Sequence, residues 1–398
     1  MYLSTDMTAL NSSNGRQNLI ALMSGTSVDS IDGVLVEIGG DLPDVAVKVL
    51  HISQREWPSA LRSRLLGVMA PATAATAEMC ELNILVAREF AALANEVADS
   101  GPVRRDQIAA IASHGQTICH LPPGLDRAIG STLQIGDVSA IAQIAGLPTI
   151  GNFRTADMAV GGQGAPLVPF ADRILLSDAT RFRCIQNIGG IANVTFLPPR
   201  SAPDSPVIAF DTGPGNMLLD ALASIVSKGA KSFDDKGQRA ASGNVDAALL
   251  AKLQTHYCFS KAPPKSTGRE DFGRQLALRL TDENPAMPPE NLLATAAELT
   301  AWSVADAYRR FLPRFPDDVI LCGGGIYNDD LVGRINRHLF PAGSAGVQFI
   351  DSFGIPNKAR EAVCFAILGW AWLRNFPGNL PEVTGAARPV LCGQYARP

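Results

Sequence analysis

The sequence lacks the features that assign a chain quickly to a common functional class. Its 34 Lys and Arg against 38 Asp and Glu give a net charge of -4, which is no basic excess for nucleic acid. No run approaches the ~20 apolar residues of a membrane span. Walker A, HExxH, GxSxG, GxGxxG and kinase HRD motifs are all missing, so the commonest enzyme classes recognised by short motifs are excluded.

Cysteine is sparse and scattered. The seven cysteines form no CxxC pair and no His/Cys spacing typical of a metal site. This odd, dispersed set predicts a reduced, cytoplasmic protein without a metal held by His and Cys. The leader 1–17 is polar and has no apolar core, so we expect a frayed tail and not a signal peptide.

The 398 residues are enough for two or three domains of ~150 residues each. Hydrophobic residues at 46% and charged residues at 18% predict ordinary globular domains with sizeable cores. Strand-like runs over 19–52 predict a three-stranded meander. Helical spacing follows over 75–98, and a strand is expected over 108–113, ending before His114. This alternation predicts a mixed α/β domain.

The second half of the chain repeats this theme. Residues 183–196 again have the pattern of strand, small-residue turn and strand, and a third strand over 207–210 leads to Asp211. A long helix is expected over 291–311, followed by a strand over 318–322. Two meanders with glycine turns predict a duplicated architecture.

Three glycine-rich turns each follow an expected strand, at 24–27, 189–190 and 323–325. Glycine lets the backbone approach a ligand closely, and successive N–H groups in a turn can hold phosphate oxygens. Singly, each turn is more often structural. Together, across both halves, they predict a nucleotide clamped in a cleft between two domains.

Several polar residues near these turns admit two interpretations. Asp211 lies where an α/β sheet presents catalytic groups, or else it caps the helix that follows. Asp29 and Asp32 either order Mg²⁺ through water or make Asx turns, and the turns are favoured. His114 and His120 either bind substrate or are structural, and the structural role is favoured.

A set of motifs, taken together and in order, resembles the anhydro-N-acetylmuramic acid kinases over nearly the whole chain, from Leu19 to about Trp372. The motifs are Met23-Ser-Gly-Thr-Ser27 with Asp29 and Asp32, Ser113-His-Gly-Gln-Thr117, Leu133-Gln-Ile-Gly-Asp137, Gly161-Gly-Gln-Gly-Ala-Pro-Leu-Val-Pro169, Asn187-Ile-Gly-Gly-Ile-Ala-Asn193, Phe210-Asp-Thr-Gly-Pro-Gly-Asn216, Ser266-Thr-Gly-Arg-Glu270 and Cys322-Gly-Gly-Gly325. One departure is Ser30, where the family usually has Gly, and it raises the question of the local backbone angle.

The resemblance implies the fold of the sugar kinase, heat-shock ATPase and actin superfamily. In that fold two actin-like, ribonuclease H-like α/β domains with mixed sheets close around an interdomain ATP cleft. We expect residues 1–150 plus 355–398 to form the N-terminal domain, completed by the C-terminal helix, and residues 151–354 to form the second domain. The family also implies a homodimer.

The resemblance further implies an ATP-dependent kinase of peptidoglycan (cell-wall) recycling that uses Mg²⁺ with ATP. Water would open the internal ring of 1,6-anhydro-N-acetylmuramic acid while O6 takes the γ-phosphate, giving N-acetylmuramic acid 6-phosphate and ADP. By carry-over, the residues expected to bind ATP are Gly25, Thr26, Ser27, Val28, Asp29, Ser30, Ile31 and Asp32 in a first phosphate loop, Asn187, Gly189 and Gly190 in a second, and Gly323, Gly324 and Gly325 on the adenosine side.

The same resemblance gives candidate catalytic and substrate residues. Asp211 is the candidate general base for the water that attacks C1, and Glu361 is expected to help orient that water. An Arg suits a lactyl carboxylate because its planar fork can bond both oxygens. The candidates for contacts to the sugar and its carboxylate are Gln116, Thr117, His120 and Arg154.

Three other functions are set against this one. An ATP-switch or filament protein of the same fold would bind nucleotide without a sugar pocket, and the Asp211 loop with Gln116 and Arg154 argues against it. A kinase of an ordinary hydroxylated sugar would accept free N-acetylmuramic acid or glucosamine as readily as the anhydro form. A dinucleotide oxidoreductase is disfavoured by the missing GxGxxG.

Overall fold

The computed structural model describes residues 15–69, 74–124, 129–341 and 346–398, so residues 1–14 of the polar leader lie outside the described residues. The chain forms two compact units. Unit 1 comprises Met1–Leu175 and Gly354–Pro398, and unit 2 comprises Leu176–Phe353. The domain boundaries and the ATP cleft expected from the sequence stay predictions.

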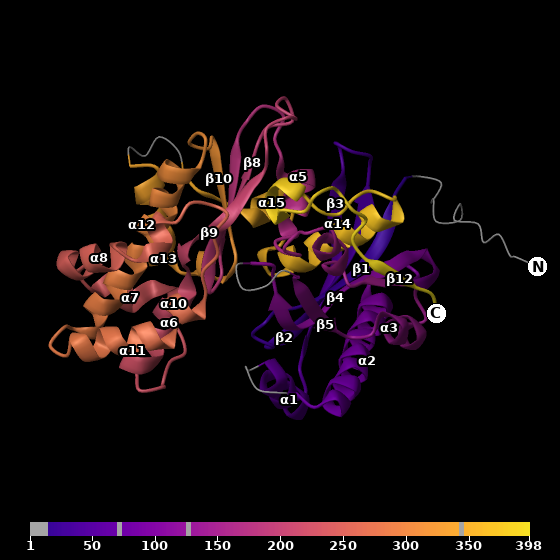
Figure 1. Cartoon of the computed structure of the whole chain (residues 1–398), viewed down its shortest axis with the longest axis horizontal. Helices are drawn as coiled ribbons and strands as arrows, with labels where there is room; N and C mark the ends of the chain where they lie inside the picture. Colours follow the sequence, from indigo (N-terminus) through magenta and orange to yellow (C-terminus); the bar gives the residue numbers. More distant parts are fainter. Residues whose placement is uncertain (1–14, 70–73, 125–128, 342–345) are drawn as a thin grey trace, which may run out of the picture. The chain divides into compact units, whose positions relative to one another are not determined.

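In the described residues, unit 1 is built on a seven-stranded mixed sheet with the order β12-β6-β4-β1-β2-β3, to which β5 adds by pairing with β4 (Figure 1). Strands β1, β2 and β3 form the expected antiparallel meander, and β1, β4 and β6 are parallel. Strands β5 and β12 run antiparallel to their partners. The bounds are β1 (Gln17–Ser24), β2 (Ser30–Gly39), β3 (Ala46–Glu56), β4 (Ile108–Leu121), β5 (Ser131–Ile135), β6 (Thr149–Gly151) and β12 (Gln394–Ala396).

Helices pack on both faces of this sheet. Ile20 of β1 belongs to a buried cluster with Phe90 of α2, whereas its neighbour Leu19 lies against Gly369 of α14. A Cβ at Gly369 would lie 2.7 Å from that of Ala112, so glycine lets α14 approach β4 closely. The helices of unit 1 are α1 (Ser59–Met69), α2 (Thr76–Ser100), η2 (Arg105–Gln107), α3 (Val138–Ala145), α4 (Thr155–Ala159), α5 (Val168–Leu176), η6 (Asn357–Ala359), α14 (Arg360–Leu373) and α15 (Pro381–Thr384).

Unit 2 repeats the pairing of unit 1. Its sheet has the order β11-β10-β7-β8-β9, in which β7, β8 and β9 form an antiparallel meander and β7, β10 and β11 are parallel. The bounds are β7 (Arg183–Ile188), β8 (Ile191–Leu197), β9 (Ile208–Pro214), β10 (Asp318–Cys322) and β11 (Gln348–Phe349). The predicted mixed α/β fold, with two mixed sheets of ribonuclease H-like strand order, is therefore confirmed.

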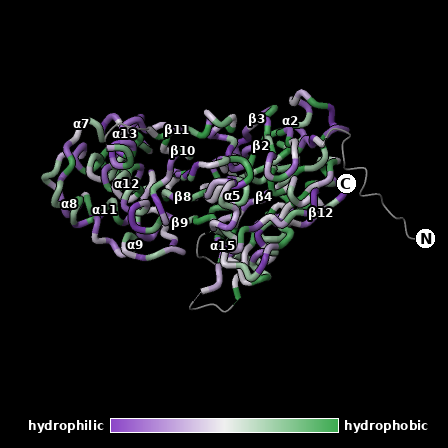
Figure 2. Tube along the Cα trace, turned by 90° about the horizontal axis from the view of Figure 1, so that it is seen from above, coloured by the Kyte–Doolittle hydropathy of each residue, from purple (hydrophilic) through white to green (hydrophobic). Residues whose placement is uncertain are grey.

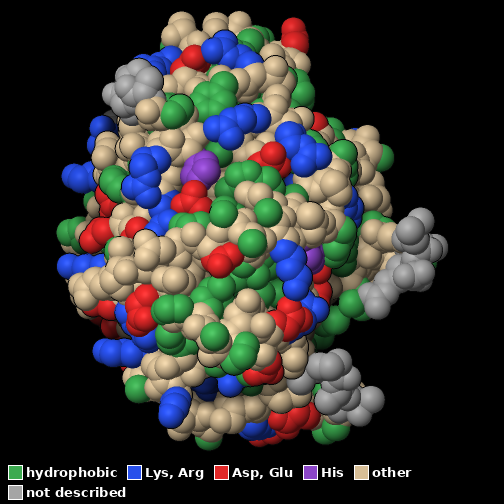
Figure 3. All heavy atoms as spheres, turned by 90° about the vertical axis from the view of Figure 1, so that its left-hand side faces the viewer, with side chains coloured by type: hydrophobic (Ala, Val, Ile, Leu, Met, Phe, Trp, Pro, Cys, Tyr) green, Lys and Arg blue, Asp and Glu red, His purple; other side chains and the backbone are tan. Residues whose placement is uncertain are grey.

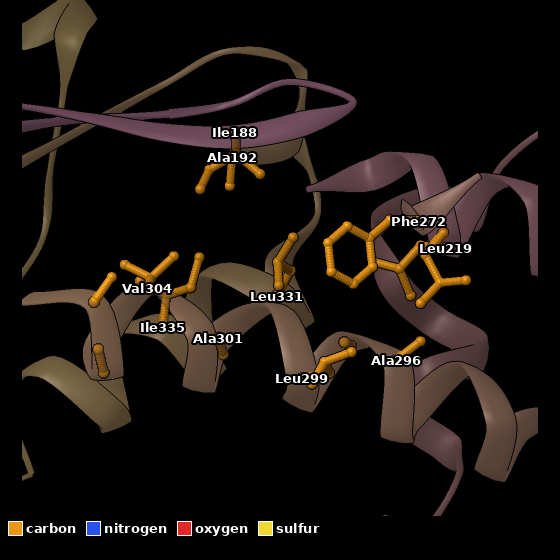
Figure 4. Close-up of a cluster of buried hydrophobic side chains, with 14 of the residues drawn as sticks. Ile188, Ala192, Leu219, Phe272, Ala296, Leu299, Ala301, Val304, Leu331 and Ile335 are labelled. Atoms are coloured by element: carbon orange, nitrogen blue, oxygen red, sulfur yellow. The ribbon is translucent and has the colours of Figure 1, made fainter. Parts of the chain in front are cut away.

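One side of the unit 2 sheet is covered by helices that enclose its core. Ile188 of β7 and Ala192 of β8 face Leu331 of α13 and Val304 of α12 (Figure 4). The helices of unit 2 are α6 (Asn216–Val226), η3 (Asp235–Gly237), α7 (Gln238–Ser242), α8 (Ala247–Gln254), α9 (Tyr257–Ser260), α10 (Arg269–Phe272), α11 (Arg274–Glu283), α12 (Pro289–Phe311), η4 (Gly324–Tyr327), α13 (Asp329–Leu339) and η5 (Ile350–Phe353).

Hydrophobic and hydrophilic segments alternate closely along the chain (Figure 2). Among the described residues, no helix has both the length and the apolar character needed to cross a bilayer. On the face drawn in Figure 3, acidic and basic side chains are interspersed. Exposed ion pairs occur among the described residues, for example between Lys252 and Glu283, 2.9 Å apart.

Candidate functional site

The turn between β1 and β2 is closed at its neck by side-chain hydrogen bonds. Trp57 Nε1 donates to Ser24 Oγ at 3.2 Å, and Ser24 Oγ donates to the carbonyl of Ser30 at 3.0 Å. From β4, Gln116 Nε2 donates to the carbonyl of Gly25 at 3.2 Å. The structure thus brings one candidate sugar residue, Gln116, to the candidate phosphate loop.

Arg62 of α1 holds the other side of this turn. Its Nε donates to the carbonyl of Val28 at 2.7 Å, and its guanidinium pairs with Asp29 at 3.0 Å. Val28 is fully buried and has a φ of +54°, a strained conformation for a β-branched residue. Ser30 has no positive φ, and its Oγ accepts a hydrogen bond from Gln54 at 2.9 Å. Serine at position 30 therefore fits without backbone strain.

The tip of the turn presents donors to solvent. Thr26 and Ser27 are exposed, and within the described residues their backbone N–H groups donate no hydrogen bond. A Cβ built at Gly25 would meet only Ser27 Oγ, at 3.9 Å, so the space beside Gly25 is open. Open space beside unpaired N–H groups suits an anion. The side chains of Val28 and Ile31 are buried and leave only their backbone for a ligand.

Asp32 lies on β2, opposite Met23 of β1. Burial raises the pKa of Asp32, and a hydrogen bond from Gln54 Nε2 at 2.8 Å and the positive charge of Lys358 oppose this rise. In the described part of the chain its carboxylate accepts from no backbone N–H, so the favoured Asx turn is wrong for Asp32. Its carboxylate is instead held beside the β1–β2 turn by the side chain of Gln54, which lies on β3.

Arg154, at the N-terminus of α4, is locked against His114. Its Nε and one terminal nitrogen donate to His114 Nε2 at 3.2 and 2.9 Å, and the other terminal nitrogen donates to the carbonyl of Gly164 at 2.9 Å. His114 Nδ1 donates to the carbonyl of Gly115 at 2.9 Å, which fixes the neutral tautomer. Burial and the charge of Arg154 hold the pKa of His114 well below its usual value.

Strand β4, which carries His114, is longer than expected. The sequence predicts an end at Ser113, but β4 continues to Leu121 because β5 pairs with it from Gln116 onward. The candidates Gln116, Thr117 and His120 therefore lie on a strand and not in a loop. The paired residues are 10 (Leu121 with Ser131) to 19 (Gln116 with Ile135) positions apart in sequence, which the local pattern does not reveal.

His120 and Thr117 share one polar network on β4 and β5. His120 Nδ1 lies 3.0 Å from Thr132 Oγ1, and Gln134 Nε2 donates to Thr117 Oγ1 at 3.3 Å and to Thr132 Oγ1 at 2.7 Å. Burial first, and then the charge of Arg154, lower the pKa of His120. Thr132 and Gln134 also line a cavity of about 420 Å³ in unit 1, a volume in the range of small-molecule sites.

Glu361 is exposed in the first turn of α14. Its negative charge acts on Arg154, whose pKa burial lowers to about 10 while Glu361 opposes the fall. Glu361 therefore belongs with Arg154, His114 and His120 in unit 1.

In unit 2 the candidate turns lie together. The N–H of Asn216 donates to the carbonyl of Gly189 at 2.8 Å, and the N–H of Gly215 donates to the carbonyl of Gly190 at 3.0 Å. Gly323, at a φ of +85°, directly follows β10, and a Cβ there would collide with Oδ1 of Asn187. The structure thus brings together Asn187, Gly189, Gly190, Gly323, Gly324 and Gly325.

Asp211 lies within β9 of unit 2, not at a helix cap, because the residue that caps α6 is Gly215. The N–H of Thr267 donates to Asp211 Oδ2 at 3.0 Å. Burial raises the pKa of Asp211 to about 6, against the effects of the Thr267 hydrogen bond and the charge of Lys265. A half-buried carboxylate with this pKa is suited to general base catalysis near neutral pH.

Sequence reasoning missed the residues that hold these groups. Thr267 lies in a motif that the resemblance included, but nothing local indicates its bond to Asp211. Gln54 and Arg62 lie in ordinary elements without any signal that they grip the β1–β2 turn. The burial of His114 against the ring of Phe365, 4.5 Å between centroids, agrees with its favoured structural role.

Comparison with known proteins gives a consistent family. The family model described as anhydro-N-acetylmuramic acid kinase matches residues 17–397. The anhydro-N-acetylmuramic acid kinase of Gloeobacter violaceus is 47% identical over 374 residues, covering 94% of this chain and 97% of that protein. The kinase of the same name from Gloeothece citriformis is 42% identical over 390 residues, covering 95% and 98%.

Among solved structures, xylulose kinase from Rhodospirillum rubrum aligns with a TM-score of 0.42 and 11% sequence identity, covering 88% of this chain and 89% of that one. The family assignment rests on the sequence relatives.

Proposed function

The chain belongs to the anhydro-N-acetylmuramic acid kinase family, and from this premise we propose that it phosphorylates O6 of 1,6-anhydro-N-acetylmuramic acid with ATP while water opens the anhydro ring. The products are N-acetylmuramic acid 6-phosphate and ADP. The same proposal places the enzyme in the cytoplasm, in cell-wall recycling, as a homodimer.

The observation that carries the proposal is the state of Asp211. Its carboxylate is half-buried on a strand, its pKa is about 6, and one oxygen is held by Thr267. At neutral pH it is ionised and can take a proton from the water that attacks C1, while O6 leaves C1 and attacks phosphorus. Glu361 orients that water in the proposed scheme. A positioned base contributes ~10²–10⁴-fold to such a step.

The sugar acid is assigned to the polar residues of unit 1. Arg154 has five N–H donors, of which His114 and Gly164 engage three; among the described residues, one donor on each terminal nitrogen then remains for a ligand. Two such donors match the two oxygens of a lactyl carboxylate. The uncharged groups of Gln116, Thr117 and His120 suit the hydroxyl and acetamido groups of the sugar.

ATP is assigned to the glycine turns of the two units. The N–H groups of Thr26 and Ser27 suit phosphate oxygens, and the cluster around Asn187 and Gly323 suits the remainder of the nucleotide. Among the described residues no group of three or more His, Cys, Asp or Glu is placed to hold a metal ion. Kinases usually bind Mg²⁺ through the phosphates of the substrate and one or two carboxylates, and we assign the carboxylate of Asp32 to this role. When bound with ATP, Mg²⁺ neutralises charge on the phosphates.

An ADP-release assay with Mg-ATP tests this function. Three reactions run in parallel, with 1,6-anhydro-N-acetylmuramic acid, with free N-acetylmuramic acid and with no sugar. ADP release only with the anhydro sugar, with a 6-phosphate product by mass spectrometry, supports the ring-opening kinase. Equal rates with the free sugar would show an ordinary sugar kinase, and sugar-independent release would show an ATP-switch protein.

A further inference from the structure

Asp157, in α4, is completely buried in unit 1, and both of its carboxylate oxygens accept hydrogen bonds. Its Oδ1 accepts from Asn379 Nδ2 at 2.6 Å and from Thr384 Oγ1 at 2.7 Å, and its Oδ2 accepts from the N–H of Gly164 at 2.8 Å. A buried carboxylate is tolerated only with such a set of donors. The donors come from two segments more than 200 residues apart in sequence.

These contacts lock the glycine-rich loop at residues 161–164. The N–H of Gly162 donates to the carbonyl of Asp157 at 2.9 Å, and a Cβ at Gly162 would collide with the Asp157 carboxylate. The N–H of Gln163 donates to the carbonyl of Thr384 at 2.8 Å. The loop is therefore held from one side by Asp157 and from the other by the segment around α15.

The same loop reaches Arg154. The N–H of Gly164 donates a hydrogen bond to Asp157, and the carbonyl of Gly164 accepts one from the guanidinium of Arg154 at 2.9 Å. Its φ of +69° favours glycine, and a Cβ there would lie 2.7 Å from the Met158 side chain. Gly164 thus connects the buried carboxylate of Asp157 directly to the guanidinium of Arg154.

We propose that Asp157 is a positioning residue that aims Arg154 at the carboxylate of an acidic sugar, and so sets selectivity for acidic over neutral sugars. The inference rests on the proposed function for its substrate. Without the Asp157 carboxylate, the N–H of Gly164 loses its acceptor and the loop relaxes. Arg154 then loses its third anchor, and its planar guanidinium is no longer held in the one orientation that presents both remaining donors to a carboxylate.

The test compares one sugar in two charge states. Initial rates are measured for the wild type, Asp157→Asn and Asp157→Glu with 1,6-anhydro-N-acetylmuramic acid and with its neutral lactyl methyl ester. The inference expects KM for the acid to rise roughly tenfold in Asp157→Asn, the order of one hydrogen bond to a charged group. It expects kcat to stay within about twofold and KM for the ester to stay unchanged, since only the aim of Arg154 is altered.

The matched control is Glu382→Gln, in the same α15 segment, where Glu382 makes a partly exposed pair with Arg173 at 3.5 Å. This variant is expected to behave as the wild type with both sugars. Equal effects of Asp157→Asn on acid and ester, or an unchanged KM for the acid, would overturn the inference. If Asp157→Asn is too unstable to assay, Thr384→Val removes one donor and keeps the carboxylate, and it is expected to give a smaller change in the same direction.

A spectroscopic measurement separates this inference from the proposed function. In protein labelled with ¹⁵N-arginine, the Nε–H signal of Arg154 is assigned by its loss in Arg154→Lys. We expect a protected signal in the wild type that shifts and exchanges faster in Asp157→Asn. An unchanged signal would overturn the positioning role even in an active enzyme, whereas a wild type that ignores the anhydro sugar would overturn only the substrate.

Discussion

The N–H of Thr267 donates to Asp211 Oδ2 at 3.0 Å, and in return the N–H of Asp211 donates to the carbonyl of Lys265 at 3.2 Å. Both the backbone and the carboxylate of Asp211 are therefore fixed against one short segment. Among the described residues, the second oxygen, Oδ1, accepts no hydrogen bond. This arrangement leaves one oriented oxygen to receive a proton.

Replacing this carboxylate tests the assignment of the base. Asp211→Asn keeps the size of the side chain but cannot accept a proton at neutral pH. We expect kcat to fall by ~10²–10⁴-fold, while the Kd values for ATP and the sugar, measured by calorimetry, change little. Near-normal turnover would remove Asp211 from this role.

The control for this experiment is Asp220→Asn on α6. Burial also raises the pKa of Asp220 to about 6, and no hydrogen bond holds it in the described part of the chain. The two variants therefore remove carboxyl groups of similar pKa, of which only Asp211 lies on the strand beside the glycine turns. Asp220→Asn is expected to keep wild-type turnover.

The pH dependence of kcat/KM follows from the same pKa. Because a general base must be ionised, protonation of Asp211 below its pKa of about 6 removes activity. We expect kcat/KM to rise about tenfold per pH unit below this value and to level off above it. Measurement over the acid range in buffers of constant ionic strength checks this prediction. A profile that stays flat through pH 5 would exclude Asp211 as the base in the free enzyme.

The strands of the two meanders could be predicted because each is encoded in a local pattern. The meander over 19–52 and the strand over 318–322 are continuous apolar or alternating runs bounded by turn residues, and the structure forms them there. The glycine turns were predicted for the same reason, since each follows such a run. In unit 2 they come together because β7 and β10 are parallel neighbours.

The contacts that hold the site could not be predicted, because they join residues distant in sequence. The end of β4 depends on pairing with β5, and the aim of Arg154 depends on Asp157 and on Thr384 near the other end of the chain. The strained residue of the β1–β2 turn is Val28, where the sequence comparison drew attention to Ser30. Neither the register nor the backbone angles of such a turn are encoded in its residue types alone.

Gly323 and Gly25 are both candidate ATP-binding glycines, but the structure requires glycine only at position 323. A Cβ at Gly323 would collide with Asn187 at a φ of +85°, whereas a Cβ at Gly25 meets nothing nearer than 3.9 Å. We therefore expect Gly323→Ala to lower the Tm by several degrees, since a strained substitution costs about 1–3 kcal/mol. Gly25→Ala is expected to leave the Tm unchanged and to raise KM for ATP, because only a ligand needs that space.

Differential scanning fluorimetry and initial rates at varied ATP distinguish the two variants. A lower Tm for Gly25→Ala, with KM for ATP unchanged, would contradict the assignment of the β1–β2 turn to phosphate binding.

A partly buried ion network in unit 2 makes stability depend on pH. Glu298 of α12 accepts from His338 Nε2 at 2.6 Å and from Arg334 at 2.8 Å, both on α13. The His338 hydrogen bond is the largest cause that lowers the pKa of Glu298 from 4.5 to about 2. Since the pKa is depressed in the folded state, the stabilisation is complete above about pH 4.5 and is lost as the pH falls through about 2.

Glu298→Gln is therefore expected to lower the free energy of unfolding at pH 7 by about 1–3 kcal/mol, measured by urea denaturation. The difference between the variant and the wild type should shrink steadily between pH 4.5 and pH 2.5, because over this range Glu298 takes up a proton in the unfolded wild type but not yet in the folded state, whose pKa is about 2. Glu283→Gln, which breaks the exposed pair with Lys252, is the control and should change little at either pH. A difference for Glu298→Gln that stays constant over this range would show that the lost stability comes from packing and not from the charge.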